Sequence, residues 1–161
     1  MAVVVYDLPV PELELTLVAG GSLLPNTTYY FATFYSVNYG GQSKLSVQQW
    51  ITTDTTNLTI KVKTKWLNGG SYDYNKPTLP FTYSGATVSH NIVWDTIDMT
   101  DGSGNYVFRK TAIALLTGTG TTYNVNYTTA PAKANQFYSY IPELYAYSDP
   151  ILPASFSKIQ G

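Results

Sequence analysis

Residues 58–66, LTIKVKTKW, place apolar or threonine side chains at every second position, with lysines at three of the positions between. A period of two separates the side chains onto the two faces of a β-strand, whereas a helix would mix them. This segment therefore predicts a strand with one face toward a core. The core face carries Leu58, Ile60, Val62, Thr64 and Trp66, and the other face carries Lys61, Lys63 and Lys65.

The lysine face of this strand has two interpretations. Lysines keep an exposed strand edge from pairing with a second chain, so a solvated face on an edge strand explains them. A row of three cations could instead meet an acidic partner. We favour the solvated edge, because such rows are ordinary on a strand that faces water.

The segment 28–38, TYYFATFYSVN, is aromatic or β-branched on both faces, which predicts a central strand that is covered on both sides. No segment has a convincing amphipathic helix pattern, and a charged share of 12% with 15 tyrosines favours strands. Seven to nine short strands separated by glycine-rich turns predict an all-β, antiparallel sandwich. The shorter strand patterns cover 12–17, 45–52, 88–97, 105–116 and 121–128.

Charge and composition exclude several classes of function. Nine basic and ten acidic residues give a net charge of −1, so we expect no nucleic-acid partner. Cysteine is absent, which removes disulfides, thiolate metal sites and cysteine nucleophiles. The longest uncharged stretch, 15–43, is rich in polar residues and turn formers, so we expect no membrane partner. The first 15 residues lack a basic leader region, and we expect a soluble chain without export.

Candidate catalytic and metal-binding residues are few, and we predict no enzyme, no cofactor and no metal. His90 is the only histidine, and its neighbours Ser89 and Asp95 do not form a triad through sequence proximity. We interpret His90 as a structural imidazole in a strand or at its edge. The oxygen-rich stretch 95–105 lacks the spacing of a calcium loop, and its segment 101–105, DGSGN, is typical of a hairpin turn.

The tyrosines exceed what one sandwich core needs, and tyrosine is favoured at protein interfaces. A loop-like stretch at 67–87 and a proline-punctuated tail after 130 carry many of them. We predict three regions: an N-terminal arm at 1–11, a sandwich domain at 12–130, and an extended C-terminal arm at 131–161. The candidate interface or ligand contacts are Tyr72, Tyr74, Tyr83, Phe137, Tyr138, Tyr140, Tyr145 and Tyr147.

Two stretches resemble a known kind of module. Residues 20–31, GGSLLPNTTYYF, and 37–43, VNYGGQS, followed by Ser46, are similar to fibronectin type III-like and immunoglobulin-like modules of tailed-phage virion proteins. Such modules carry a Gly-Gly-Ser-Leu turn, a Thr-Tyr-Tyr strand and a hairpin closed by serine. In physical terms, a tyrosine strand packs across a sandwich and paired glycines allow a tight hairpin.

Weaker matches extend this resemblance over about 15–130. The strand 58–66 ends in tryptophan, 85–87 is Gly-Ala-Thr, and 121–123 is Thr-Thr-Tyr, as in the later strands of that module. Two features depart from it: His90 and Trp94 stand where tyrosine and arginine are usual, and the 67–87 stretch is long.

The resemblance implies a role in a virion, where such modules occur on capsid shells, tail tubes, baseplates and fibres. We therefore predict a non-enzymatic virion structural protein, an auxiliary or decoration capsid protein or a tail or neck component. Its expected partners are other virion proteins, the major capsid protein or tail and neck proteins, in a multi-copy assembly. The alternative is a carbohydrate- or receptor-binding module of a fibre, with tyrosines of 67–87 stacked on sugars.

Overall fold

A computed structural model of the chain describes residues 8–38, 41–79, 85–106, 114–118 and 120–131. This part of the chain contains eight strands and no helix, and therefore no helix long and apolar enough to span a membrane. The strands are β1 (Glu12–Val18), β2 (Thr28–Val37), β3 (Gln49–Thr52), β4 (Thr59–Asn68), β5 (Ser71–Asp73), β6 (Val88–Asp95), β7 (Ala114–Gly118) and β8 (Asn124–Tyr127).

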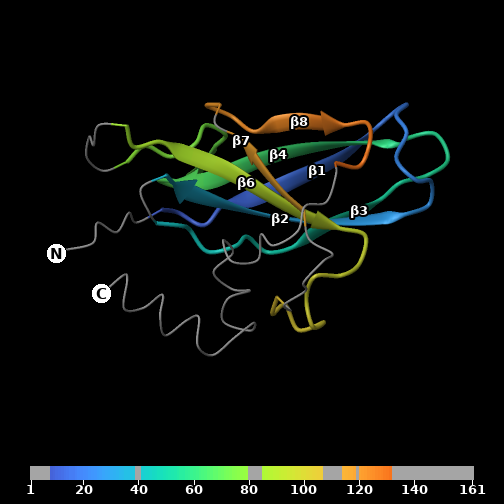
Figure 1. Cartoon of the computed structure of the whole chain (residues 1–161), viewed down its shortest axis with the longest axis horizontal. Helices are drawn as coiled ribbons and strands as arrows, with labels where there is room; N and C mark the ends of the chain where they lie inside the picture. Colours follow the sequence, from blue (N-terminus) through green and yellow to red (C-terminus); the bar gives the residue numbers. More distant parts are fainter. Residues whose placement is uncertain (1–7, 39–40, 80–84, 107–113, 119, 132–161) are drawn as a thin grey trace.

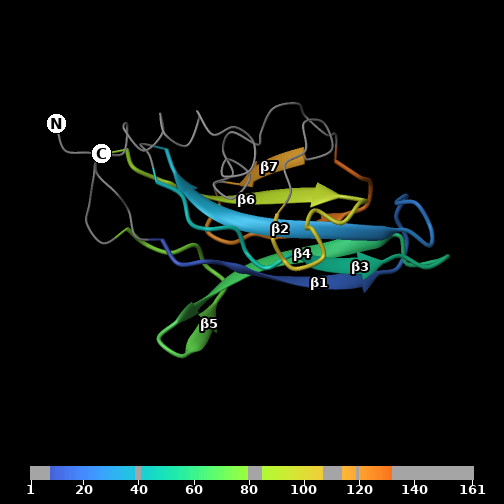
Figure 2. The same ribbon diagram turned by 90° about the horizontal axis from the view of Figure 1, so that it is seen from below.

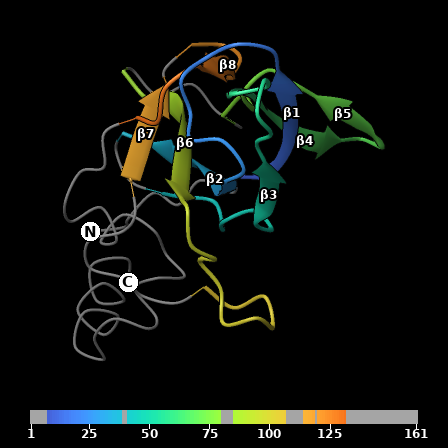
Figure 3. The ribbon, with the colours of Figure 1, turned by 90° about the vertical axis from the view of Figure 1, so that its right-hand side faces the viewer.

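The strands form two antiparallel sheets that lie face to face (Figures 1 and 3). One sheet has the order β3-β2-β6-β7. In the other, β1 pairs with one edge of β4, while β8 and β5 pair with successive stretches of its other edge. The all-β antiparallel sandwich predicted from the sequence is confirmed.

The main core lies between the two sheets and follows the alternation of the strands. One face of β2 and β6 meets the inner face of β1 and β4, and apolar side chains from all four strands interdigitate there. Tyr29 and Trp94 are part of this core, with their ring centroids 5.9 Å apart. The buried members of this cluster are Leu13, Leu23, Tyr29, Phe31, Ile60, Val62, Ile92, Trp94 and Tyr123.

Strand β2 is central and covered on both faces, as its two-sided apolar sequence predicts. It pairs with β3 on one side and β6 on the other. Ala32 and Phe34, on the face away from the main core, are buried against Met99 and Tyr106 of the segment that follows β6. The second apolar face of β2 therefore has a cover within the same chain.

The edge-strand interpretation of the lysines is wrong, because β4 is paired along both edges. Its expected inner face is confirmed in Ile60, Val62 and Thr64, which are fully buried. Trp66, at the end of the same row, is only partly buried, and its indole nitrogen donates to the Asn75 carbonyl at 2.7 Å. The lysines lie on the outer face of a central strand, so their row requires a different explanation.

The stretch 67–87 is not a loop throughout. β4 extends to Asn68, turns at Gly69 and Gly70, and returns as β5, with Trp66 to Asn68 opposite Asp73 to Ser71. This hairpin projects away from the body of the sandwich (Figure 2). Both turn glycines have positive φ, which permits the tight return.

The predicted arms lie largely outside the described residues. Of the N-terminal arm, residues 8–11 are described, and Leu8 is buried in a small cluster with Tyr35, Val37 and Val88. Of the C-terminal arm, only residue 131 is described. The boundaries at 11 and 131 therefore stay predictions.

Candidate functional site

The outer face of the β1–β4 pair carries alternating opposite charges. In the antiparallel register Glu12 lies opposite Lys65 and Glu14 opposite Lys63. The Lys65 ammonium lies 3.7 Å from a Glu14 carboxylate oxygen. A partly exposed ion pair of this kind contributes little by itself, about 0–1 kcal/mol. The contribution of this ion pair therefore depends on the side chains that pack over it.

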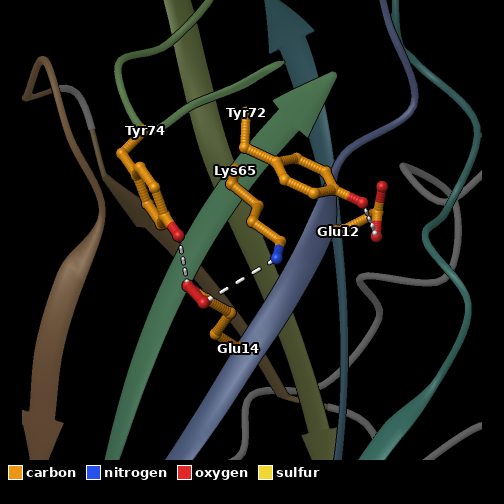
Figure 4. Close-up of polar contacts among 5 residues, drawn as sticks. All are labelled: Glu12, Glu14, Lys65, Tyr72 and Tyr74. Carbon is orange, nitrogen blue, oxygen red and sulfur yellow. Dashed lines mark hydrogen bonds and ion pairs between the residues drawn. The ribbon is translucent and has the colours of Figure 1, made fainter. Parts of the chain in front are cut away.

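Two tyrosines from the β5 side cross over β4 to reach the glutamates of β1 (Figure 4). The Tyr74 hydroxyl donates to Glu14 at 2.7 Å, and the Tyr72 hydroxyl donates to Glu12 at 3.2 Å. The Lys65 ammonium lies 3.9 Å from the centre of the Tyr72 ring, a cation–π geometry. The four side chains with Lys65 form a single polar layer, which we call the outer-face ladder.

The ladder alters the acidity of its phenols. Hydrogen bonding to Glu12 raises the pKa of Tyr72, and the negative charge of that carboxylate adds to the effect. Hydrogen bonding to Glu14 likewise raises the pKa of Tyr74. Both hydroxyls donate in these bonds, and the ladder fastens the β4–β5 hairpin over β1. Within the lysine row, this explains Lys65 as an internal support rather than an edge guard.

Near its turn, the β4–β5 hairpin carries an exposed apolar pair, of which Tyr72 also belongs to the outer-face ladder. Leu67 on β4 lies directly opposite Tyr72 on β5. Leu67 is 56% exposed and Tyr72 is 46% exposed. A cross-strand pair on one face of a projecting hairpin presents contiguous apolar surface, which is typical of a contact with another protein.

A second site is a groove on the opposite sheet. It has a volume of about 600 Å³ and lies between the segment 45–50 and the turn 98–106. Trp50 and Val47 stand beside it with 62% and 77% of their surfaces exposed. The lining residues are Leu45, Ser46, Val47, Gln48, Trp50, Asp98, Thr100, Gly102, Gly104, Asn105 and Tyr106.

Hydrogen bonds hold the polar wall of this groove in place. The Gln48 amide donates to Asp98 at 2.8 Å and accepts from the Met99 backbone N–H at 2.8 Å. The same Asp98 oxygen also accepts from the backbone N–H and the hydroxyl of Thr100, both at 2.8 Å. The Tyr106 hydroxyl donates to the Ser46 carbonyl at 2.6 Å. The groove is thus built from two chain segments that are about 50 residues apart and joined by side chains.

Of the predicted contact residues, the structure brings Tyr72 and Tyr74 together on the outer face of β4. Tyr72 keeps exposed ring surface, while Tyr74 is partly buried. The remaining predicted contacts, Tyr83, Phe137, Tyr138, Tyr140, Tyr145 and Tyr147, lie outside the described residues.

The oxygen-rich stretch 95–105 serves turn formation, as its hairpin interpretation predicts. Asp101 accepts from the backbone N–H of Ser103 and from the Asn105 side chain, and these bonds lower its pKa. Within the described residues, no group of three or more histidine, aspartate and glutamate side chains is arranged to hold a metal ion. His90 lies within β6 and is fully buried, rather than at a strand edge.

Sequence reasoning missed the groove and its tryptophan. Trp50 and Ile51 are adjacent apolar residues in one strand, so only one of them can face the main core. Ile51 packs against that core, and Trp50 faces away from it. The two adjacent apolar residues in the sequence could have indicated that one of them faces away from the main core, although they do not show which one.

Searches against protein-family models, curated proteins and solved structures found no match to this chain.

Proposed function

We propose that the chain is a non-enzymatic structural component of a virion that binds neighbouring virion proteins in a multi-copy assembly. The observation that carries the proposal is the exposed Leu67–Tyr72 pair at the end of the projecting β4–β5 hairpin. The virion context depends on the resemblance of 20–31 and 37–46 to tailed-phage modules.

The construction of the hairpin supports a docking role. An exposed hairpin of two short strands is marginally stable by itself. The bonds from Tyr72 to Glu12 and from Tyr74 to Glu14 hold this hairpin to the sandwich before any partner binds. A partner would therefore meet a preformed apolar surface, which lowers the ordering cost of association.

The strand order is compatible with an immunoglobulin-like module. Strands β3-β2-β6-β7 follow the order of the C′, C, F and G strands, and β1 beside β4 corresponds to B beside E. Strand β8 departs from the immunoglobulin order. It is the last described strand, and it pairs with the edge of β4 where strand D would lie. This correspondence supports the proposed family of modules, and β8 would be its distinguishing feature.

Particle incorporation tests the proposal. Virions assembled with the wild-type chain are purified on a density gradient and compared with virions assembled with the double variant Leu67→Asn, Tyr72→Ser. We expect the wild-type chain to co-sediment with particles. The amount of the double variant that co-sediments should be at least tenfold lower, because both changes remove apolar surface at the same contact.

The matched control is Leu24→Asn. Leu24 is 62% exposed and lies in the β1–β2 connection, at the opposite end of the sandwich from the hairpin (Figure 2). This variant should be incorporated like the wild type. Absence of the wild-type chain from particles would refute the virion role, and equal incorporation of the hairpin variant would refute the docking site. Thermal unfolding of each purified variant shows whether it is folded.

A further inference from the structure

We propose that two copies of this chain dimerise by antiparallel pairing of their β1 strands, so that one sheet runs continuously through both copies. The inference goes beyond the proposed structural role, because it concerns a different surface and a partner that the purified chain itself supplies. It follows from three properties of β1: an edge without guards, an apolar row that continues to that edge, and a sequence that complements its own antiparallel copy.

β1 is the longest edge strand among the described residues. It has seven residues, whereas β3, β5, β7 and β8 have three to five. In the part of the chain that the structure describes, β1 pairs with β4 alone, in an unbroken register over residues 12–18. It thus forms one margin of its sheet (Figure 2). The side of β1 away from β4 therefore presents backbone N–H and C=O groups to which a further strand can bond.

This edge lacks the features that keep edge strands from pairing with other chains. Lysines, prolines, bulges and inward-pointing charges serve that purpose. The segment ELELTLV has no lysine, proline or glycine, and its register with β4 contains no bulge. Its charged residues, Glu12 and Glu14, point outward and are held by the outer-face ladder. A second chain therefore meets none of these guards along β1.

The apolar surface of the main core continues to the edge of β1. Leu13 is buried, whereas Leu15 and Leu17 pack against the main core but are only partly buried. Ile51 of the opposite sheet is likewise partly buried beside this core. A strand added to β1 would place its own inward side chains next to Leu15 and Leu17, because directly opposite residues of an antiparallel pair point to the same face. Covering these leucines contributes to the driving force for pairing.

The alternation of β1 determines the register of the pairing. A register that set a leucine opposite a glutamate would turn the leucines of one copy to solvent. Among the registers that keep leucines opposite leucines, the one centred on Leu15 aligns all seven residues. It sets the two copies of Leu15 opposite each other and Leu13 opposite Leu17. A two-fold axis at Leu15 relates the copies, so every contact off the axis occurs twice.

This register also suits the charges on the outer face. Glu14 lies opposite Thr16 of the second copy, whose hydroxyl can donate a hydrogen bond to a carboxylate. A register centred on Glu14 would instead set the two glutamates directly opposite each other, which is destabilising. With the axis at Leu15, the two glutamates are offset by two residues, and each keeps its own Lys65 ammonium at 3.7 Å. The nearby cations reduce the repulsion that remains.

Sedimentation equilibrium of the purified full-length chain over a wide concentration range tests the dimer. We expect a reversible equilibrium, with the mass rising from 17.8 kDa toward twice that value. Two substitutions of the exposed Thr16 should act in opposite directions. Thr16→Glu sets like charges directly opposite each other at two places and should weaken the dimer about fivefold or more, whereas Thr16→Lys should bind at least as tightly as the wild type.

The stability of the monomer distinguishes this effect from a general change in folding. Within one copy, Thr16 lies opposite Lys61. Thr16→Glu therefore gains an opposite charge inside its own sheet, and Thr16→Lys meets a like charge. Urea unfolding of dilute protein should show the reverse order from the dimer affinities, so lost stability cannot explain a weaker Thr16→Glu dimer.

Cysteine substitution tests the register, because the chain has no cysteine of its own. Leu15→Cys sets two thiols opposite each other on the axis, where Cα atoms about 4.5–5.5 Å apart permit a disulfide. Thr16→Cys is the matched control, since its two copies are offset by two residues and exceed the roughly 7 Å that a disulfide can span. Diamide, which accepts the hydrogens of both thiols, should link Leu15→Cys chains and leave Thr16→Cys chains unlinked.

The inference is overturned if the wild-type chain stays a monomer, if Thr16→Glu and Thr16→Lys dimerise equally, or if Thr16→Cys chains link as readily as Leu15→Cys chains. A dimer that none of these variants affects would lie on another surface and would overturn the inference equally. Thermal unfolding shows whether each variant is folded. Leu67→Asn on the hairpin should dimerise like the wild type, so the outcome here is separate from that of the proposed docking site.

Discussion

The imidazole of His90 packs edge-on against the ring of Tyr35, with 5.4 Å between the ring centroids and 64° between the planes. The two residues are register partners on β6 and β2, and both are completely buried. Neither imidazole nitrogen makes a well-directed hydrogen bond to the described residues. Burial therefore lowers the pKa of His90, and the charge of Lys76 acts in the same direction, while the backbone near Gly120 and Thr121 offsets it only in part.

This burial predicts that stability depends on pH through one group. The folded state keeps His90 neutral, whereas the unfolded chain protonates it near its ordinary pKa of 6.5. The stability that the protein has with His90 neutral is therefore fully present above the pKa of the unfolded chain, and it is lost as the pH falls below that pKa. We expect the free energy of unfolding, measured in urea between pH 7.5 and 5, to fall with a slope of at most about 1.4 kcal/mol per pH unit.

His90→Phe is the matched variant for this measurement. Phenylalanine resembles imidazole in shape and has no proton to bind, and His90 is the only histidine in the chain. The slope between pH 7.5 and 5 should vanish in this variant, while the stability at pH 7.5 stays similar. An unchanged slope would show that other groups cause the pH dependence.

The strands were predictable wherever a long alternating pattern met a large core. β2 and β4 each run for ten residues, and their faces follow the sequence period. β5 was missed because it has three residues, too few to show alternation, and because Gly69 and Gly70 indicate only a turn. The fastening of Tyr72 and Tyr74 to β1 depends on bonds between residues 60 positions apart, which local patterns do not contain.

The groove could not be predicted from local sequence patterns, for a related reason. Its two walls, 45–50 and 98–106, are far apart in the sequence and come together because β2 pairs with both β3 and β6. Within the turn, the sequence did predict the local chemistry, since Asp101 and Asn105 close it as expected. Which apolar residue of β3 faces outward depends on the register with β2, and only the fold supplies that register.

The alternation of 58–66 places Trp66 on the core face of its strand, and its partial exposure can be tested with Tyr29 as the fully buried reference. Tyr29 is 2% exposed in the main core, and its hydroxyl accepts from the Leu24 backbone N–H at 3.1 Å. Tyr29→Ala should lower the free energy of unfolding by about 3–5 kcal/mol. Trp66→Ala, at a partly exposed position, should cost about 1–2 kcal/mol, including its bond to Asn75. Urea unfolding of both variants measures the difference, and equal losses would contradict the placement of Trp66.

The two glycines before β2 should differ sharply when each is replaced by alanine. Both have positive φ, +81° at Gly20 and +92° at Gly21, so either change costs about 1–2 kcal/mol of backbone strain. A Cβ on Gly20 meets nothing within 4 Å, whereas a Cβ on Gly21 would overlap the Leu58 carbonyl and the Thr59 hydroxyl.

The overlap at Gly21 adds about 1–3 kcal/mol, because the Leu58 backbone is fixed in place by its own bonds to Gly20 and Leu23. We therefore expect Gly21→Ala to lower the unfolding free energy by about 2–5 kcal/mol and Gly20→Ala by about 1–2 kcal/mol. Chemical denaturation of the two variants in parallel gives the comparison, with Gly20→Ala as the control for backbone strain. If the two variants lose the same stability, the close approach of Gly21 to the start of β4 is not present in the folded protein.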